Sequence, residues 1–572
     1  MSDDPRLSWS LANPFGIVID AAAETWWSGR VFDIVELDGG DSGVLLGTET
    51  GGVWIVDAAN DALPLSNNWT NPNTNCVVAG PDGPRHFYAA GVGGVIYESD
   101  ASHVTPLLQW APISDALPSE AGDVYDIVVL RRHRLILAAC RGGLYWSAIP
   151  ETPPWWCVLK QLPPNSGARP PYHWTRADEE KLGQGGYFSL AVASLTGHTE
   201  LAGEEGLSGI SIIAGAFNGG VFFARRSGGT FVLKRSRAIF KGDDLTDLLF
   251  GLTSGPSSVA SCEGFPLNGY AACARSDGRL QMVLRSKDGG RTFVMTENDV
   301  KVDGEDRDIR AQAGDQGAGG APNNCIAVDP SAPGVVAFGW QDGTFVSPNA
   351  GKTWIRVGGE VHHADVHVLL FKRPTPDGQH LLYIGSDGGL AQVNMGDVIG
   401  GLPVVARSDY NRQLATLQLY STWVTRQFYG TTSASPNGNG KVSAGAHDNG
   451  NINCELAGAP TPWLRLDGGD GGWNGIVDDG GLVRNVKGTA ATQALASAPG
   501  FIDKGIIPIH VPLPIDPAGV ISPIGDVVRR PAFRNDFGQR MFAVAGNSGK
   551  PTEVYGIFQN GPEQTYHWER LG

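Results

Sequence analysis

The stretch Val44-Leu-Leu-Gly-Thr-Glu-Thr-Gly-Gly-Val-Trp54 contains the unit that decides the fold. A short apolar segment runs into a Gly-rich turn, and a second segment follows that begins with an apolar and an aromatic residue. Glycine permits the positive φ angles and the tight backbone that such a turn requires. The stretch therefore predicts two antiparallel β-strands joined by a hairpin.

The same unit recurs along the chain. Further copies lie at 88–97, 137–145, 213–222, 272–280, 337–345, 383–390, 442–450 and 544–549, with a degenerate copy near 478–481. This makes ten units spaced about 55 residues apart, enough for four strands each, as is typical of propeller blades. Small residues just before the turns indicate crowded inner strands near a channel.

We therefore expect an all-β chain in which residues 1–572 form one large β-propeller of about ten four-stranded blades. Closure into a ring hides the edges of the sheets. Two smaller propellers in tandem are the alternative, with a boundary that the sequence does not locate. The composition agrees with many turns in a folded chain, because 79 of 572 residues are Gly while 16 are Trp and 41% are hydrophobic.

Charge and composition narrow the classes of partner. The net charge of −16 argues against nucleic acid and anionic membranes. No apolar run of about 18 residues is present to insert into a membrane, and the start of the chain lacks the regions of a signal peptide. We expect a soluble protein, cytoplasmic or exported by a non-classical route. The seven Cys favour buried thiols, although Cys262 and Cys273 could pair in an oxidising compartment.

A second motif occurs twice, as Ser286-Lys-Asp-Gly-Gly-Arg-Thr-Phe293 and Ser347-Pro-Asn-Ala-Gly-Lys-Thr-Trp354. These segments resemble Asp-box repeats, also called BNR repeats. We expect the acidic or amide side chain to bond backbone N–H groups of its own turn and the aromatic residue to pack between sheets. In families with Asp boxes the motif lies away from the reactive face, so the resemblance implies a framework role.

Other stretches are similar to bacterial BNR-repeat proteins, which are related to sortilin-type ten-bladed propellers and two-ring xyloglucanases. They lie at 29–35, 363–367, 385–389, 447–450 and 469–472. The resemblance implies a propeller fold. It leaves the activity open, because one fold carries many functions.

The segment His363-Ala-Asp365-Val-His367 is a candidate metal site. On a strand, alternate residues share one face, so its two imidazoles and its carboxylate would project together toward a divalent metal. Additional ligands would come from carboxylates in Gly-rich turns, namely Asp387, Asp448 and Asp470. In the alternative interpretation these side chains bond neighbouring backbone and fix the inner loops.

A glycosidase would need two carboxyl groups on either side of a cleft. The resemblance to xyloglucanases implies a catalytic Asp in an Asp-x-Gly-Gly turn of each ring. The first matching turn here carries Glu49 in place of Asp, and the second carboxyl would be Asp387 or Asp470.

Four tryptophans lie in or beside turns and could stack on sugars or anchor a protein partner: Trp26, Trp27, Trp340 and Trp473. Together with Asp448 they form the candidate binding residues. The preferred prediction is a non-enzymatic propeller that binds a protein or glycan partner, or acts as a scaffold, through its loop-rich face. The alternative is a glycoside hydrolase acting on a β-glucan-type polysaccharide, so the sequence leaves open whether the protein is an enzyme.

Overall fold

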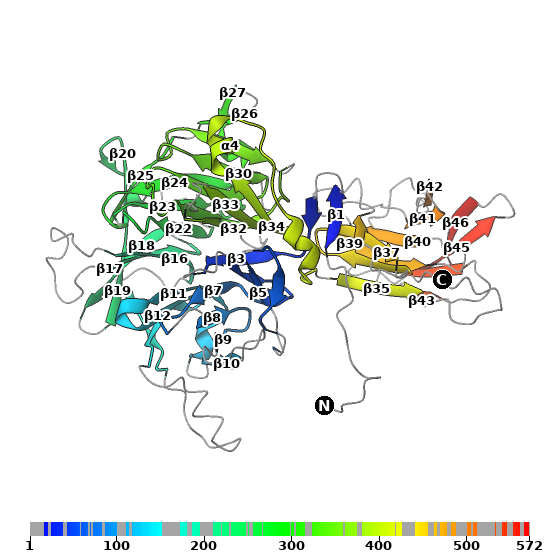
Figure 1. Cartoon of the computed structure of the whole chain (residues 1–572), viewed down its shortest axis with the longest axis horizontal. Coiled ribbons are helices and arrows are strands. Elements are labelled where there is room, and N and C mark those ends of the chain that lie inside the picture. Colours follow the sequence, from blue (N-terminus) through cyan, green and yellow to red (C-terminus); the bar gives the residue numbers. More distant parts are fainter. Residues whose placement is uncertain are drawn as a thin grey trace, which may run out of the picture. The chain divides into compact units, whose positions relative to one another are not determined.

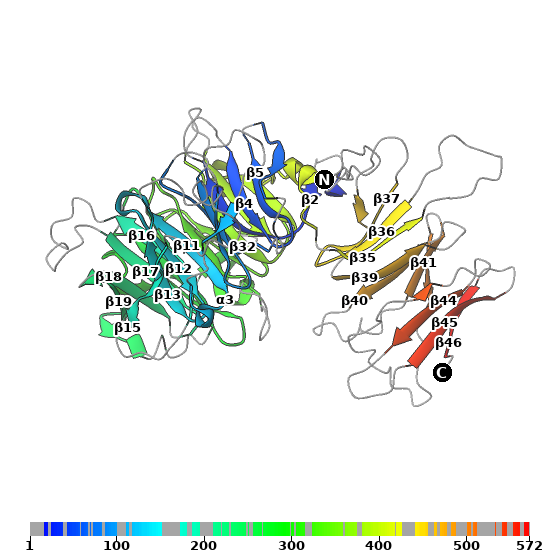
Figure 2. The same ribbon diagram turned by 90° about the horizontal axis from the view of Figure 1, so that it is seen from below.

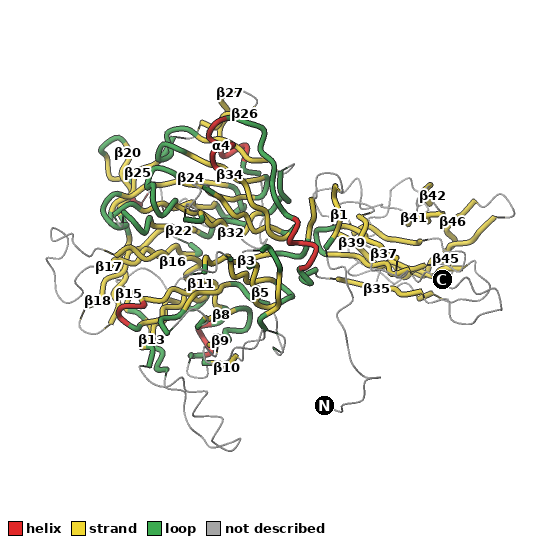
Figure 3. The backbone as a smooth tube through the Cα atoms, in the orientation of Figure 1, coloured by secondary structure: helices red, strands yellow, loops and turns green. Residues whose placement is uncertain are grey.

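The computed structural model is built of β-strands with only short helical segments (Figure 3). It describes residues 16–570 apart from 21–24, 38–42, 58, 67–68, 70–72, 83–85, 100–109, 114–116, 151–171, 180–185, 195–209, 219, 228–229, 248–249, 251–254, 266, 298, 303–304, 315–322, 359–360, 374–379, 418, 426–440, 456–462, 466–469, 477–481, 488–499, 505–506, 512–531, 534–539, 546–552 and 561–564.

The chain divides into two compact units. The first unit is split, comprising residues 1–29 and 411–572, and we call it the split unit. The second comprises residues 30–410 and we call it the ring unit. The chain thus leaves the split unit after Gly29 and returns to it at Asn411.

The ring unit contains seven sheets in chain order. The first three are β3 (Val31–Glu36), β4 (Val44–Thr48), β5 (Gly52–Val56) and β6 (Ala62–Pro64); β7 (Cys76–Ala79), β8 (Phe87–Ala90), β9 (Ile96–Ser99) and β10 (Trp110–Pro112); and β11 (Val124–Leu130), β12 (Leu135–Cys140), β13 (Gly143–Ala148) and β14 (Thr175–Arg176). The fourth is β15 (Asp178–Glu179), β16 (Tyr187–Ser194), β17 (Ile210–Ala216), β18 (Val221–Ser227) and β19 (Thr230–Arg235).

The fifth sheet is β20 (Arg237–Phe240), β21 (Asp243–Asp244), β22 (Ser257–Ser261), β23 (Gly269–Ala274), β24 (Leu280–Ser286) and β25 (Thr292–Met295). The sixth is β26 (Asp299–Val302), β27 (Glu305–Asp308), β28 (Cys325–Val328), β29 (Val336–Trp340), β30 (Gly343–Ser347) and β31 (Trp354–Gly358), and the seventh is β32 (Val366–Phe371), β33 (Leu381–Ser386) and β34 (Gly389–Asn394). Short helical segments are η2 (Ser119–Ala121), η3 (Arg131–His133), α3 (Ile309–Gln312), α4 (Met395–Gly400) and η4 (Asp409–Gln413).

The seven sheets form a closed ring around a central axis (Figures 1 and 2). The innermost strand of each sheet packs against that of the next, in the order β3, β7, β11, β16, β22, β28, β32, and β32 packs against β3. The sheets of the described residues number ten, as the repeat predicts, but seven of them close by themselves within the ring unit. The prediction of one ring of ten blades is therefore wrong, whereas the alternative of two smaller propellers in tandem stays a prediction.

The split unit contains the other three sheets of the described residues. They are β1 (Ile17–Asp20) and β2 (Thr25–Trp27) with β35 (Leu419–Thr425), β36 (Lys441–Ala446), β37 (Gly450–Glu455) and β38 (Trp463–Arg465); β39 (Asp470–Ile476), β40 (Leu482–Lys487), β41 (Gly500–Lys504) and β42 (Ile507–Val511); and β43 (Ala532–Phe533), β44 (Arg540–Ala545), β45 (Glu553–Asn560) and β46 (Thr565–Arg570). Strand β1 pairs in parallel with β38, so the N-terminal segment completes a sheet formed by residues after 418.

The small residues before the Gly-rich turns lie on the second strand of each sheet, not on the innermost strand. Ala89, Ala138 and Ala271 are examples, and all three are fully buried. The predicted hairpins are correct, whereas the predicted place of the small residues at the channel is wrong. Their small side chains instead allow close packing between neighbouring sheets.

Four innermost strands of the ring unit contain a β-bulge near their first residue, which leaves one residue without a direct cross-strand partner. These residues are Phe32, Tyr125, Phe188 and His367. A bulge redirects a side chain from the regular alternation of the strand. Each of these four bulges therefore carries one aromatic or imidazole side chain.

The residue after a bulge joins its sheet to the next. Asp33 accepts a hydrogen bond from the backbone N–H of Val77 at 2.7 Å, and Asp126 accepts one from Leu190 at 2.6 Å. Both residues are half-buried, and the loss of solvation at their carboxyl groups raises the pKa of Asp33 to about 7 and that of Asp126 to about 8. These bonds connect the first sheet to the second and the third sheet to the fourth.

The two Ser-x-Asp/Asn-x-Gly-x-Thr segments form the turns between β24 and β25 and between β30 and β31. Asp288 Oδ1 accepts from the backbone N–H of Thr292 at 2.8 Å, and Asn349 Oδ1 accepts from that of Thr353 at 2.9 Å. The aromatic residues that follow, Phe293 and Trp354, are fully buried. The predicted turn chemistry and packing are confirmed.

Five cysteines among the described residues, which include Cys262 and Cys273, are buried free thiols, as the sequence favours, and the alternative pairing of these two is not formed. Cys262 instead donates to the carbonyl of Asp329 at 3.1 Å. Within the described residues, no helix has the length and apolar character needed to cross a membrane.

Candidate functional site

Glu49 and Asp387 occupy equivalent places in the first and last sheets of the ring unit. Each is the first residue of the Gly-rich turn between the second and third strands of its sheet. The sequence repeat predicts this place for both. The second strand of each of these sheets runs antiparallel to the innermost strand. The turns that follow the second strands therefore lie at the end of the ring where the innermost strands begin.

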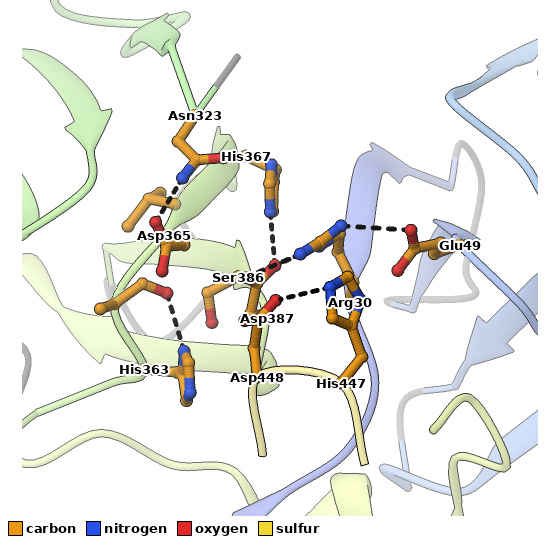
Figure 4. Close-up of polar contacts among 12 residues, drawn as sticks. Arg30, Glu49, Asn323, His363, Asp365, His367, Ser386, Asp387, His447 and Asp448 are labelled. Carbon is orange, nitrogen blue, oxygen red and sulfur yellow. Dashed lines mark hydrogen bonds and ion pairs between the residues drawn. The ribbon is translucent and has the colours of Figure 1, made fainter. Parts of the chain in front are cut away.

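One arginine holds the two carboxylates together (Figure 4). Arg30 directly precedes β3 and donates from Nη1 to Glu49 Oε1 at 3.1 Å and from Nη2 to Asp387 Oδ2 at 2.9 Å. Its Nε donates to the other oxygen of Asp387, which makes that pair bidentate. The Asp387 side chain is 4% exposed, against 16% for Glu49.

His367, at the bulge of β32, is the third partner of Asp387. Its Nε2 lies 2.6 Å from Asp387 Oδ1. Burial opposes ionisation of Asp387, but the attraction of His367 and Arg30 outweighs it and holds the pKa of Asp387 well below its usual range. Burial lowers the pKa of His367. We therefore assign an ionised Asp387 that accepts hydrogen bonds from Arg30 and from His367 Nε2.

Asp365 lies beside this cluster and differs from it in protonation. It has a φ of 59°, which is uncommon for a residue other than Gly, and its Oδ1 accepts a hydrogen bond from Asn323 (Figure 4). Burial and the negative charge of Asp387 raise the pKa of Asp365 to about 7, against the attraction of Arg30. Two neighbouring carboxyl groups thus have pKa values that are pushed in opposite directions.

The predicted metal site is not formed. Strand β32 begins at Val366, so His363 and Asp365 precede the strand and do not alternate with His367 along one face. The Nδ1 of His363 bonds the carbonyl of Ala364 at 2.9 Å, as the alternative interpretation expects. Among the described residues, no group of three His, Cys, Asp or Glu side chains could hold a metal ion.

The two other predicted carboxylates belong to the split unit. Asp448 lies in the turn after β36, has a φ of 55° and is 3.4 Å from His447 Nε2. Asp470 was expected in a turn but is the first residue of β39, paired with Lys487. The position of its side chain lies outside the described residues.

The predicted tryptophans have different environments. Trp340 is fully buried in β29 and donates from Nε1 to the carbonyl of Gly278 at 3.2 Å, so the prediction of a binding platform is wrong for this residue. Trp26 and Trp27 are half-buried on β2, and the guanidinium of Arg465 lies 4.5 Å from the centre of the Trp27 ring. Trp473 is on β39, and its side chain lies outside the described residues.

A cavity of about 460 Å³ lies at the axis of the ring unit, beside the Arg30 cluster. Every innermost strand contributes to its lining, and Arg30, Glu49 and His367 line it, whereas Asp387 lies behind Arg30. The cavity is of the size of small-molecule sites, about 300 to 1,000 Å³.

Sequence reasoning missed Arg30 and Asn323 as site residues. A signal for Arg30 exists in the sequence, because Arg30-Val-Phe32, Asp123-Val-Tyr125 and Asp365-Val-His367 are corresponding segments before and at the bulge of three innermost strands. Aligning them places Arg30 at the same point of its sheet as Asp365. No comparable pattern marks Asn323.

These features define a β-propeller protein with a cluster of carboxyl groups at the mouth of its ring. The fold is similar to that of a GH74 enzyme from Niastella koreensis, with a TM-score of 0.55, 14% identity, and coverage of 96% of this chain and 73% of that one. An ancestral GH74 enzyme has a TM-score of 0.48 at 11% identity, with 98% and 78% coverage. No family model and no curated protein matches the sequence.

Proposed function

We propose that this protein is a glycoside hydrolase that cleaves a β-glucan-type polysaccharide at the Arg30 cluster. The observation that carries the proposal is that one guanidinium binds the carboxylates of Glu49 and Asp387, with the protonatable Asp365 beside them. Glycosidases use two carboxyl groups that flank the scissile bond, and this cluster contains three carboxyl groups.

The raised pKa of Asp365 and the lowered pKa of Asp387 suggest that the carboxyl groups of the cluster have different roles in hydrolysis. Glycoside hydrolysis needs one carboxyl group that gives a proton to the leaving oxygen and one carboxylate that acts as base or nucleophile. Asp365, with a pKa of about 7, retains a proton near neutral pH and is the acid. Glu49 lines the cavity and is the carboxylate, while Asp387 holds Arg30 and His367 and is a positioning residue.

Two further observations support the proposal. The fold is similar to that of a GH74 enzyme, and Glu49 occupies the Gly-rich turn for which the resemblance to xyloglucanases implies a catalytic carboxylate. Glu in place of Asp extends the carboxylate by one methylene, and Arg30 fixes the position of the longer side chain.

A glycan-binding protein without hydrolytic activity is the second candidate. It is favoured by the contacts of Asp387, whose two oxygens are occupied by Arg30 and His367. These contacts join the first and seventh sheets, which is a structural role that needs no chemistry.

Release of reducing ends by the full chain from xyloglucan and mixed-linkage β-glucan tests the proposal. We expect Glu49→Gln to abolish release while leaving the melting temperature within a few degrees. Glu120→Gln, which changes an exposed carboxylate in η2, is the matched control and should retain full activity. A wild-type chain that binds these glycans but releases no reducing ends from them would leave only the second candidate.

A further inference from the structure

The mouth of the central cavity has an aromatic wall that the proposed function does not use. Tyr125 and Phe188, at the bulges of β11 and β16, line the cavity. Phe217, in the Gly-rich turn after β17, packs against both, with ring centres 4.6 Å from Tyr125 and 5.6 Å from Phe188. All three rings are only partly buried.

This wall faces the Arg30 cluster across the axis. Tyr125 and Phe188 belong to the third and fourth sheets, whereas Arg30 and His367 belong to the first and seventh. The second sheet separates the two groups on one side of the ring, and the fifth and sixth sheets separate them on the other. A ligand in the cavity would therefore contact the aromatic wall on one side and the carboxyl cluster on the other.

Two polar side chains that also line the cavity, Asn75 and Asp123, are held in place by hydrogen bonds. Asn75 donates from Nδ2 to the carbonyl of Val124 at 2.9 Å, and Asp123 Oδ1 accepts from the backbone N–H of Gly93 at 2.7 Å. Both Asn75 and Asp123 line the cavity. Fixed amide and carboxylate groups can bond hydroxyl groups of a ligand with little ordering cost.

We infer that the cavity is a subsite for one neutral sugar residue, which stacks its apolar face on Tyr125 and Phe188 and turns its hydroxyl edge toward Asn75 and Asp123. This inference rests on the proposed glycan ligand. A pyranose ring has the required combination of an apolar face and a hydroxyl edge, and aromatic side chains combine with a few placed polar groups in sites of this kind. The acidic lining, which includes Glu49 and Asp123, disfavours sugars that carry carboxylate or sulfate.

Calorimetric titration of the full chain with xyloglucan heptasaccharide and cellotetraose tests the subsite. Tyr125→Leu and Phe188→Leu keep an apolar side chain but remove the aromatic face, so each should weaken binding about tenfold. Phe265→Leu changes an exposed aromatic residue in the connection between β22 and β23, which is not part of the cavity lining, and this variant should bind like the wild type. Melting temperatures establish that each variant is folded.

The outcomes separate this inference from the proposed function. Weakened binding in Tyr125→Leu and Phe188→Leu supports the subsite, even if the wild type hydrolyses nothing. Wild-type affinity in both variants, or no binding of either oligosaccharide to the wild type, overturns it. If glycan hydrolysis persists in the wild type while both variants bind normally, only the subsite is rejected. Binding of oligogalacturonate with equal affinity would contradict the preference for a neutral sugar.

Discussion

Arg30 and Asp387 are 357 positions apart in the sequence, yet their side chains form a bidentate ion pair that joins the first and seventh sheets of the ring unit. No strand is exchanged between these two sheets, because each is built from consecutive segments of the described chain. The ion pair therefore acts together with the packing of β3 against β32 at the point where the ring closes.

Removal of Arg30 should destabilise the protein strongly. Arg30→Ala removes the guanidinium from the buried Asp387 carboxylate, and loss of one partner of a buried ion pair typically costs about 3 to 5 kcal/mol. Arg30→Lys keeps the charge but not the fork of donors, so its loss should be smaller. Urea unfolding of both variants measures the difference. A decrease below about 1 kcal/mol for Arg30→Ala would show that ring closure does not depend on this pair.

The pH dependence of hydrolysis should follow Asp365. Its pKa of about 7 means that the carboxyl is protonated below neutral pH and loses its proton as the pH rises through about 7. Since the proposed acid must carry a proton, kcat should fall on the alkaline side of pH 7. Asn323 stabilises the ionised form by donating to it, so Asn323→Leu should move this limb to higher pH. An alkaline limb unchanged in Asn323→Leu would contradict the assignment of Asp365.

The sequence was sufficient to predict the hairpins, the Ser-x-Asp/Asn turns and the places of Glu49 and Asp387, because each depends on local spacing and on glycine at fixed points. It did not predict ring closure after seven sheets, since closure depends on packing between β3 and β32, far apart in the chain. The metal prediction failed for a local reason: the positive φ of Asp365 and the bulge at His367 break the alternation of a regular strand.

The stability of the ring unit should fall as the pH rises from about 5 to about 8. The pKa of Asp33 is raised to about 7 and that of Asp126 to about 8, so the folded state keeps protons that the unfolded chain has already released. Stability from such groups is fully present below the unfolded pKa and is lost progressively as the pH rises to the folded pKa.

Comparison of the wild type with the double variant Asp33→Asn/Asp126→Asn measures the contribution of these two groups to the pH dependence of stability. His367 acts in the opposite direction, because its lowered pKa costs stability as the pH falls below 6.5. It is present in both proteins and cancels in the difference. The amides cannot ionise, so the double variant should gain stability relative to the wild type as the pH rises from 5 to 8, which appears as a flatter dependence of the urea midpoint on pH. Parallel curves for the two proteins would be inconsistent with the raised pKa values.

Asp288 should stabilise its turn without affecting function. Asp288→Ala removes the acceptor for the N–H of Thr292, and we expect the free energy of unfolding to fall by about 1 kcal/mol. Asp288→Asn should be nearly neutral, since Asn349 makes the same bond in the next sheet. Denaturant unfolding and the glycan assay together check this. Loss of glycan binding in Asp288→Ala, without loss of stability, would assign the turn a functional role instead.

Residues 30–410 should fold without the rest of the chain. Their seven innermost strands close on one another, and the first and last sheets are joined by Arg30 and Asp387 within the fragment itself. The split unit differs, because β1 and β2 complete a sheet whose other four strands follow residue 418, so neither of its two segments alone contains that sheet. A fragment of residues 30–410 should therefore unfold cooperatively and lose this behaviour in Arg30→Ala. A fragment of residues 411–572 should gain a cooperative transition only when residues 1–29 are joined to it, and cooperative unfolding without them would show that β1 is dispensable.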